Sequence, residues 1–180
     1  MQTLPPNRDE QATGQRMEMN WEPPTKPATW NEGVHYALEE LDHHAKLWTP
    51  TVPPQVTMTQ IEWAVNQGNR KAASYLPVFI ECANYMKTIM SESDILDMPT
   101  LLLSRQMKYG KGNITTFGYV GIAVRLHDKL SRLTNSDEEF MDESVADTKM
   151  DIVGYTAIAI MLKNKWWELP VQHSLFGESQ

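Results

Sequence analysis

Residues 143–162 read ESVADTKMDIVGYTAIAIML, the longest stretch of the chain with the character of a single helix. Acidic side chains are spaced through its first half, and residues 152–162 form the longest apolar run in the sequence. That run is far shorter than the roughly 20 residues that a membrane-spanning helix needs. The stretch therefore predicts a long helix that enters the core of a globular domain, and it argues against a transmembrane protein.

Five further helices are expected upstream, each bounded by a capping or helix-breaking residue. The sequence Thr29-Trp30-Asn31-Glu32 fits a capping box, and so does Thr59-Gln60-Ile61-Glu62. Pro77 and Pro99 are expected near helix starts, where proline is tolerated. These signals predict helices over about 29–49, 59–68, 78–90, 97–109 and 119–133. No long alternating strand pattern is present, so the predicted fold is all-α, a bundle of about five to six helices.

The N-terminal region differs in composition from the rest. Eight of the 11 prolines lie between positions 5 and 54, and residues 1–28 are mostly polar. We expect residues 1–28 to form an extended or disordered arm, residues 29–170 to form the helical bundle, and residues 171–180 to form a tail. Trp21 and Trp30 indicate that part of this region docks on its own domain or on a neighbouring subunit.

Charge and cysteine content limit the function classes. With 16 Lys and Arg against 23 Asp and Glu, the net charge is −7, the wrong sign for a broad nucleic-acid-binding face. Cys82 is the single cysteine and cannot form an internal disulfide, and the N-terminus lacks a signal-peptide pattern. We expect a cytoplasmic protein, with no membrane association and no stable nucleic-acid complex.

Three acids at four-residue intervals form a stripe on the 143–162 helix: Glu143, Asp147 and Asp151. Like charges at this spacing repel by a few tenths of a kcal/mol per pair at a surface, but Asp151 directly precedes the apolar run and needs a partner. Facing cations would provide one. So would Mg²⁺, which prefers carboxylate oxygens. A solvated or salt-bridged face remains the alternative, and interaction with the helix dipole could account for Glu143 and Asp147 but does not reach Asp151.

The 119–133 helix places a carboxylate among three cations, and the segment before it is rich in glycine and lysine. Asp128 lies among Arg125, Lys129 and Arg132, and an antiparallel neighbour would let Asp128 join the acidic stripe while the cations face a polyphosphate. An interhelical salt-bridge ladder is the alternative. The sequence 108–113, KYGKGN, lacks the features of a P-loop and is typical of a helix stop.

The order and spacing of these motifs resemble a known family. The carrying residues are Tyr109-Gly110, Gly118 and Gly121, then Arg125-x-x-Asp128-Lys129-x-x-Arg132, then Glu143-Ser144-x-x-Asp147-Thr148-x-x-Asp151-x-x-x-Tyr155. The pattern resembles the MazG-like all-α nucleoside triphosphate pyrophosphohydrolases, most closely the small phage-type branch of nucleotide-modification-associated domains. The resemblance covers about residues 101–162, with a MazG-like core expected over about 97–163.

The resemblance implies hydrolysis of a ribo- or deoxynucleoside triphosphate to the monophosphate and pyrophosphate, with Mg²⁺, or Mn²⁺ in its place, and a homodimer or homotetramer. It makes Glu143 and Asp147 the catalytic residues. The implied metal ligands are Asp128, Glu143, Asp147 and Asp151, and the implied substrate contacts are Arg125, Lys129, Arg132, Lys108, Tyr109, Lys111 and Asn113.

Two other functions stay open. The first is a non-catalytic nucleotide-binding, sequestering or scaffold protein on the same bundle, because Lys108 stands where the family commonly has an acid and the family's earlier acidic pair is not obvious. The second is a protein-binding module built on the Pro- and Trp-containing arm. Glu40, His43 and His44 share a helix, and we expect a surface helix face there rather than a zinc site.

Overall fold

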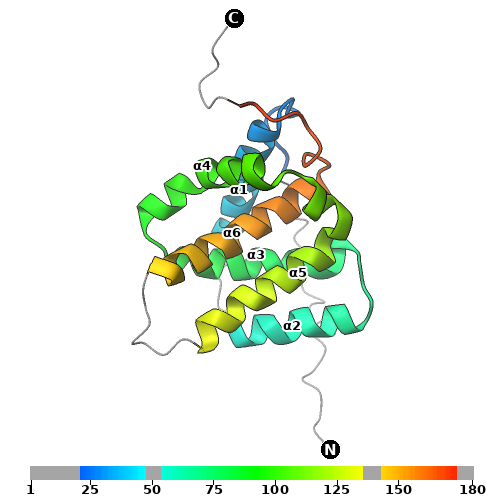
Figure 1. Ribbon diagram of the computed structural model, residues 1–180, viewed down its shortest axis with the longest axis vertical. Coiled ribbons are helices and arrows are strands. Elements are labelled where there is room, and N and C mark those ends of the chain that lie inside the picture. The colour runs from blue at the N-terminus through cyan, green and yellow to red at the C-terminus, as the bar shows by residue number, and fades with distance from the viewer. Residues whose placement is uncertain (1–20, 48–53, 136–142, 174–180) are drawn as a thin grey trace, which may run out of the picture.

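The computed structural model describes residues 21–47, 54–135 and 143–173, and within these ranges every regular element is a helix (Figure 1). The elements are α1 (Trp30–Leu47), α2 (Pro54–Asn66), α3 (Ala72–Thr88), α4 (Glu92–Tyr109), α5 (Gly112–Asn135) and α6 (Glu143–Lys163). The prediction of an all-α bundle is confirmed. Residues 1–20 of the expected arm and 174–180 of the expected tail lie outside the described residues.

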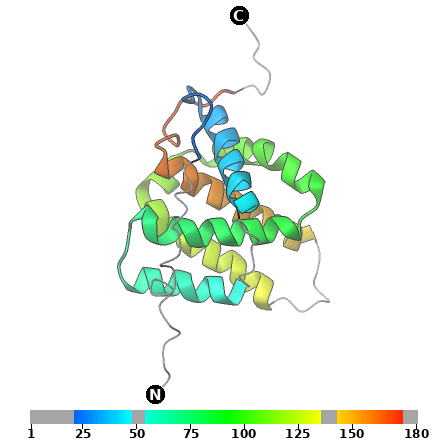
Figure 2. The same ribbon diagram turned by 180° about the vertical axis from the view of Figure 1, so that it is seen from behind.

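Helix α6 is the centre of the bundle. It packs against α1, α3, α4 and α5, whereas α2 lies farther out, against α3 and α5 (Figures 1 and 2). From Asp151 to Met161 every residue of α6 except Tyr155 is buried. A helix that is buried on all sides needs apolar residues on all sides, and the 152–162 run supplies them. Within the described residues, none of the helices combines the length and the apolar content that crossing a bilayer requires.

The first capping box forms as expected. The backbone N–H of Glu32 donates to the Thr29 hydroxyl at 3.2 Å, and the Glu32 carboxylate accepts from the backbone N–H of Thr29 at 3.4 Å. These bonds satisfy amide groups that have no partner in the first turn of a helix. The start of α1 is therefore fixed by local sequence.

Three other predicted helix starts are wrong. Helix α2 begins at Pro54 instead of Thr59, and Thr59 lies inside it with its hydroxyl donating to the Gln55 carbonyl at 3.1 Å. Pro77 and Pro99 lie inside α3 and α4. An interior proline costs about 3 kcal/mol relative to alanine. Burial of nearby apolar side chains offsets that cost. Phe79, two residues after Pro77, is 0% exposed, and Met98, directly before Pro99, is 1% exposed.

Two glycines shape the connection between α4 and α5. Gly110 ends α4 with a φ of 67°, and its N–H donates to the Gln106 carbonyl at 2.8 Å. Gly118, with a φ of 54°, interrupts α5, so the helix expected from position 119 is preceded by an additional helical segment from Gly112. Both φ values lie in the left-handed region that favours glycine. Between these two breaks, Lys111 and Thr115 form hydrogen bonds with Leu169 and Glu168 in the segment after α6.

The aromatic residues of the N-terminal region dock on their own domain. Trp30 is 1% exposed, and its ring meets Trp167 edge-on with the ring centroids 5.8 Å apart. Trp21 packs against Tyr36 at 6.2 Å. The backbone N–H of Trp30 also donates to the Pro170 carbonyl at 2.8 Å. The start of α1 and the segment after α6 therefore close over the bundle together.

The expectation of a surface face at Glu40 and His44 is wrong. Glu40 is 2% exposed and His44 4%, and the carboxylate of Glu40 accepts from Lys163 Nζ at 2.9 Å and from Asn164 Nδ2 at 3.1 Å. Burial alone raises the pKa of the Glu40 carboxyl, but hydrogen bonds from His44, Lys163 and Asn164 outweigh it, so the pKa lies below its ordinary value. The cluster joins α1 to the end of α6.

This cluster predicts a pH-dependent stability. Because the pKa of Glu40 is lower in the folded chain, ionised Glu40 stabilises the fold above about pH 4.5, and the contribution is lost as pH falls through the lowered pKa. Glu40→Gln should lower the free energy of unfolding by about 1–3 kcal/mol near neutral pH. Urea denaturation at several pH values should show a shallower acid dependence for this variant. Glu39→Gln, on the exposed neighbour, is the control; equal effects of the two changes would contradict the assignment.

Candidate functional site

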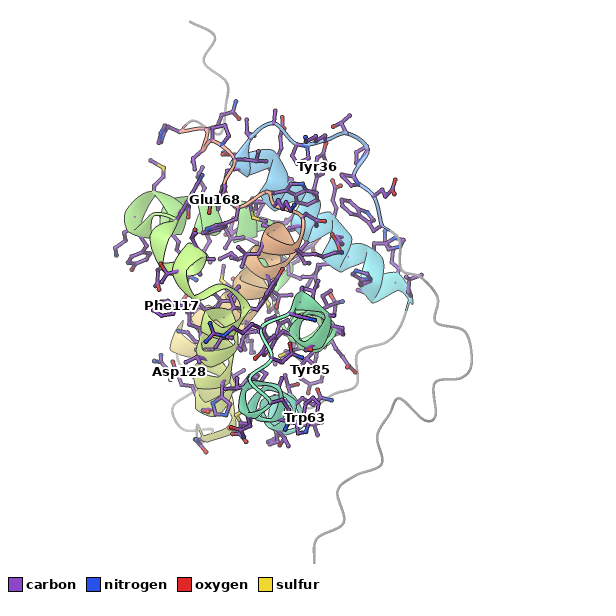
Figure 3. The ribbon with its side chains drawn as sticks, turned by 90° about the vertical axis from the view of Figure 1, so that its right-hand side faces the viewer. Tyr36, Trp63, Tyr85, Phe117, Asp128 and Glu168 are labelled. Atoms are coloured by element: carbon purple, nitrogen blue, oxygen red, sulfur yellow. The ribbon has the colours of Figure 1, made fainter. Side chains whose placement is uncertain are left out.

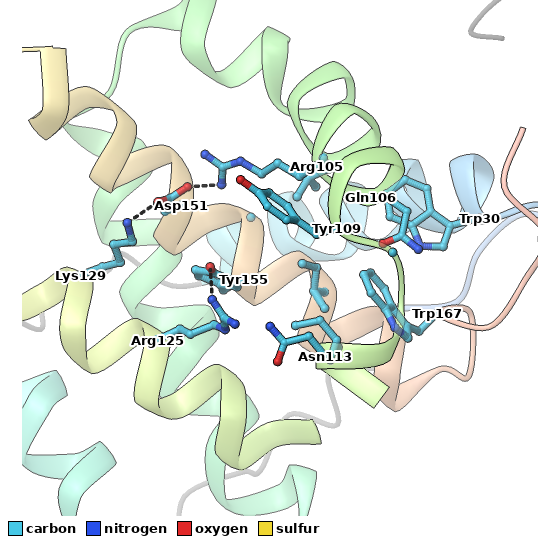
Figure 4. A pocket seen from close by; sticks show the side chains of 15 residues that line it. Trp30, Arg105, Gln106, Tyr109, Asn113, Arg125, Lys129, Asp151, Tyr155 and Trp167 are labelled. Atoms are coloured by element: carbon cyan, nitrogen blue, oxygen red, sulfur yellow. Dashed lines mark hydrogen bonds and ion pairs between the residues drawn. The ribbon is translucent and has the colours of Figure 1, made fainter. Parts of the chain in front are cut away.

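A cavity of about 600 Å³ lies between α4, α5 and α6 and reaches Trp30 and Trp167 (Figure 4). Its size falls within the range of small-molecule sites. Its two ends differ in chemistry: charged side chains gather at one end, and aromatic and amide side chains at the other. The polar and tyrosine side chains that line it are Arg105, Gln106, Tyr109, Asn113, Arg125, Lys129, Asp151 and Tyr155.

Asp151 organises the charged end. One carboxylate oxygen accepts from Arg105 Nη1 on α4, and the other lies 2.6 Å from Lys129 Nζ on α5 (Figure 4). The Asp151 side chain is only 9% exposed, against 33% for Arg105 and 19% for Lys129. A carboxylate this deeply buried requires charge compensation. Two neighbouring helices provide it.

Arg125 adds a third cation to the same end. Its Nη1 donates to the Tyr155 hydroxyl at 3.3 Å, and its guanidinium carbon lies 5.7 Å from the centroid of the Tyr155 ring. No carboxylate in the described residues forms an ion pair with Arg125. The cavity thus faces three cations and one carboxylate, in a chain whose net charge is −7. Such a local excess of positive charge favours an anionic ligand.

The close approach of α4 to α6 places Arg105 over Asp151. At Gly154 an added Cβ would lie 3.1 Å from Leu102 Cδ2 and 3.4 Å from Met98 Cε, so the absence of a side chain lets α4 pack closely. Leu102 and Arg105 are three residues apart and share one face of α4. Gly154 therefore allows α4 to pack closely enough on α6 for Arg105 to reach Asp151.

The other end of the cavity is aromatic. Trp30 and Trp167 form its wall with Ile114, Ile158 and Leu102, and Tyr109 lies at the rim with 67% of its surface exposed. The indole N–H of Trp167 donates to the Lys111 carbonyl at 3.4 Å. This bond ties the segment after Gly110 to the segment after α6. Flat apolar walls of this kind suit a planar ring.

Five of the residues predicted for the site line this cavity: Arg125, Lys129, Asp151, Tyr109 and Asn113. The other predicted phosphate contacts do not. Lys108 lies with its Nζ 5.1 Å from the centroid of the Tyr109 ring, and Lys111 Nζ donates to the Leu169 carbonyl at 2.6 Å. Arg132 is 61% exposed on α5.

The predicted metal ligands are not brought together in the described structure. Asp128 is 61% exposed on the outer face of α5 and pairs with Arg132 at 3.4 Å (Figure 3). Asp147 is exposed. Glu143 is the first residue of α6, and its side chain lies outside the described residues. Within the described residues, no group of three His, Cys, Asp or Glu side chains lies close enough to hold a metal ion.

Helix geometry separates the members of the acidic stripe. A four-residue step turns about 40° beyond one full turn, so the stripe drifts around α6. Asp151 reaches the junction with α4 and α5, whereas Asp147 faces solvent. Of the two partners that the sequence left open for Asp151, the structure shows the facing cations. Asp128, Asp147 and Asp151 in their described positions do not fit a Mg²⁺ site.

The lining residues that the sequence did not assign to the site include Trp30, Arg105, Gln106 and Trp167. Arg105 carried a usable signal, because it lies four residues before Tyr109 and shares its helical face. Trp30 had none, since it reaches the cavity only through the packing of α1 against the segment after α6.

The ion pairs of Asp151 predict a stability difference between neighbouring acids. Asp151→Ala should lower the free energy of unfolding by about 1–3 kcal/mol, because it leaves two partly buried cations without their carboxylate. Asp147→Ala, one turn earlier and exposed, should change it by no more than about 0.5 kcal/mol. Urea denaturation of both variants measures this difference, and equal values would show that Asp151 is not buried between cations.

Comparison with known protein families, with curated proteins and with solved structures found no match to the chain. The MazG-like resemblance therefore stays a prediction from the sequence motifs. The geometry of the cavity stands independently of it.

Proposed function

We propose that the cavity binds a nucleoside triphosphate. The observation that carries the proposal is the cluster of Arg105, Arg125 and Lys129, which only Asp151 opposes among the residues that line the cavity. A triphosphate brings about four negative charges, and guanidinium and ammonium groups are the side chains that compensate them. Arg125 is the first contact, because no described carboxylate competes for it.

The shape of the cavity favours a nucleotide over a simple polyphosphate. The charged end continues into a wall formed by Trp30 and Trp167 (Figure 4). A polyphosphate alone leaves such a wall without a partner, whereas a base stacks on it or packs edge-on against it. The phosphates then lie toward Arg125 and Lys129 and the base toward the tryptophans.

For the reaction, we propose hydrolysis to the monophosphate and pyrophosphate with Mg²⁺ or Mn²⁺, and its support is the order of motifs that the chain shares with the MazG-like enzymes. The described side chains include cations that can bind phosphate but no group of three metal ligands. This favours a second candidate, a protein that binds and sequesters the nucleotide. The resemblance also implies a homo-oligomer, and exposed apolar side chains on α4 and α5 support one: Leu96, Met107, Phe117 and Val124.

Binding is tested with a matched pair of arginine variants. Arg125→Ala should weaken the affinity for a triphosphate at least about tenfold, since a hydrogen bond to a charged group contributes about 1.5–3 kcal/mol. Arg132→Ala, on the same helix but outside the residues that line the cavity, should leave it unchanged. Isothermal titration calorimetry with all ribo- and deoxynucleoside triphosphates measures both. Equal affinities for the two variants would refute binding at this cavity.

A product assay separates the enzyme from the sequestering protein. Each triphosphate is incubated with protein and Mg²⁺, with and without a chelator, and the products are separated by anion exchange. Monophosphate and pyrophosphate, lost on chelation and in Arg125→Ala, would establish a hydrolase that uses this cavity. Intact triphosphate that is retained by the protein would establish the sequestering function, and Asp151→Asn should then bind it more tightly because the cavity loses its one carboxylate.

A further inference from the structure

The aromatic end of the cavity contains a hydrogen-bond donor without a partner. Trp30 is 1% exposed, and within the described structure its indole Nε1 has no hydrogen-bond partner. An indole N–H can only donate, and a buried donor left unpaired is unfavourable and uncommon in folded proteins. Trp30 lines the cavity, and its Nε1 lies just beneath the cavity surface, so a ligand reaches this N–H only after a small shift of the side chains that cover it.

A second polar group lies beside Trp30. Gln106 lines the same end of the cavity and is 6% exposed (Figure 4). Its backbone carbonyl accepts from the Gly110 N–H, and its side chain lines the cavity. A carboxamide offers both a donor and an acceptor. Three hydrogen-bonding functions therefore converge where the surrounding walls are apolar.

The polar groups of Trp30 and Gln106 lie apart from the cations at the charged end of the cavity. In Figure 4, Trp30, Gln106 and Trp167 lie together at one end, and Asp151 and Lys129 lie at the other. The molecule that satisfies both ends must be anionic at one end and must carry, at the other, a flat apolar ring with polar atoms on its edge. Nucleotides have this combination, because their phosphates are anionic and their heteroaromatic bases carry polar atoms on the ring edge, whereas inorganic polyphosphates and sugar phosphates have no such ring.

We propose that Trp30 and Gln106 form a base subsite. The Trp30 N–H donates to a carbonyl oxygen or ring nitrogen of the base, and the Gln106 carboxamide bonds the adjacent edge. This inference rests on the proposed function, because it assumes that phosphates occupy the cationic end. It gives the cavity selectivity for the base, since a site built around unpaired polar groups discriminates against ligands that leave them unpaired.

The test compares a nucleoside triphosphate with inorganic tripolyphosphate by calorimetry. Trp30→Phe removes the N–H and keeps an aromatic ring, and Gln106→Met removes the carboxamide at similar length. Each should weaken binding of the nucleoside triphosphate about tenfold and leave the affinity for tripolyphosphate unchanged. Trp63→Phe is the matched control, because Trp63 is 61% exposed on α2 and does not line the cavity (Figure 3).

Nuclear magnetic resonance gives a second readout on the unaltered protein. The indole N–H signal of Trp30, identified by its absence in Trp30→Phe, should move when the nucleoside triphosphate is added and stay in place with tripolyphosphate. The subsite is refuted if both ligands bind the wild-type protein equally, or if both variants weaken both ligands to the same extent. If neither ligand binds the wild-type protein, the proposed function fails, and the base subsite fails with it.

Discussion

The compensation of Asp151 is the constraint on which the rest of the structure depends. A carboxylate at the point where α6 enters the core is unfavourable unless cations meet it, and Arg105 from α4 and Lys129 from α5 do so. Three helices are thereby tied at one point. The same contact decides the chemistry of the cavity, because cations that are held in place for one buried carboxylate are also held in place for a ligand.

The apolar half of α6 and the glycine within it make this arrangement geometrically feasible. The buried run anchors the helix against α1 and α3 as well as against α4 and α5, so α6 cannot rotate to bring Asp147 inward without exposing apolar surface. Gly154 then lets α4 approach closely enough for Arg105 to reach across. Core packing therefore determines both that Asp151 is buried and that Asp147 stays at the surface.

Local signals predicted those parts of the fold that short-range chemistry determines. The capping box at Thr29, the helix stop at Gly110 and the long α6 all follow from neighbouring residues. The errors arose where packing overrides local preference, as at Pro77 and Pro99, which lie inside helices. The site divides in the same way: Arg125, Lys129 and Asp151 were found from spacing, whereas Trp30 contributes through tertiary contact alone.

The three cations of the cavity differ in whether they already have a carboxylate partner. Arg105 and Lys129 already have a carboxylate partner, so an entering phosphate must compete with Asp151 for them, whereas Arg125 has only the Tyr155 hydroxyl and ring. An anion therefore gains most at Arg125 and less at the other two. Tyr109 and Asn113, on either side of the bend at Gly110, also line the cavity. Arg125 on α5 and Trp30 on α1 therefore belong to separate ends of the cavity, whereas α4 contributes to both ends through Arg105 and Gln106.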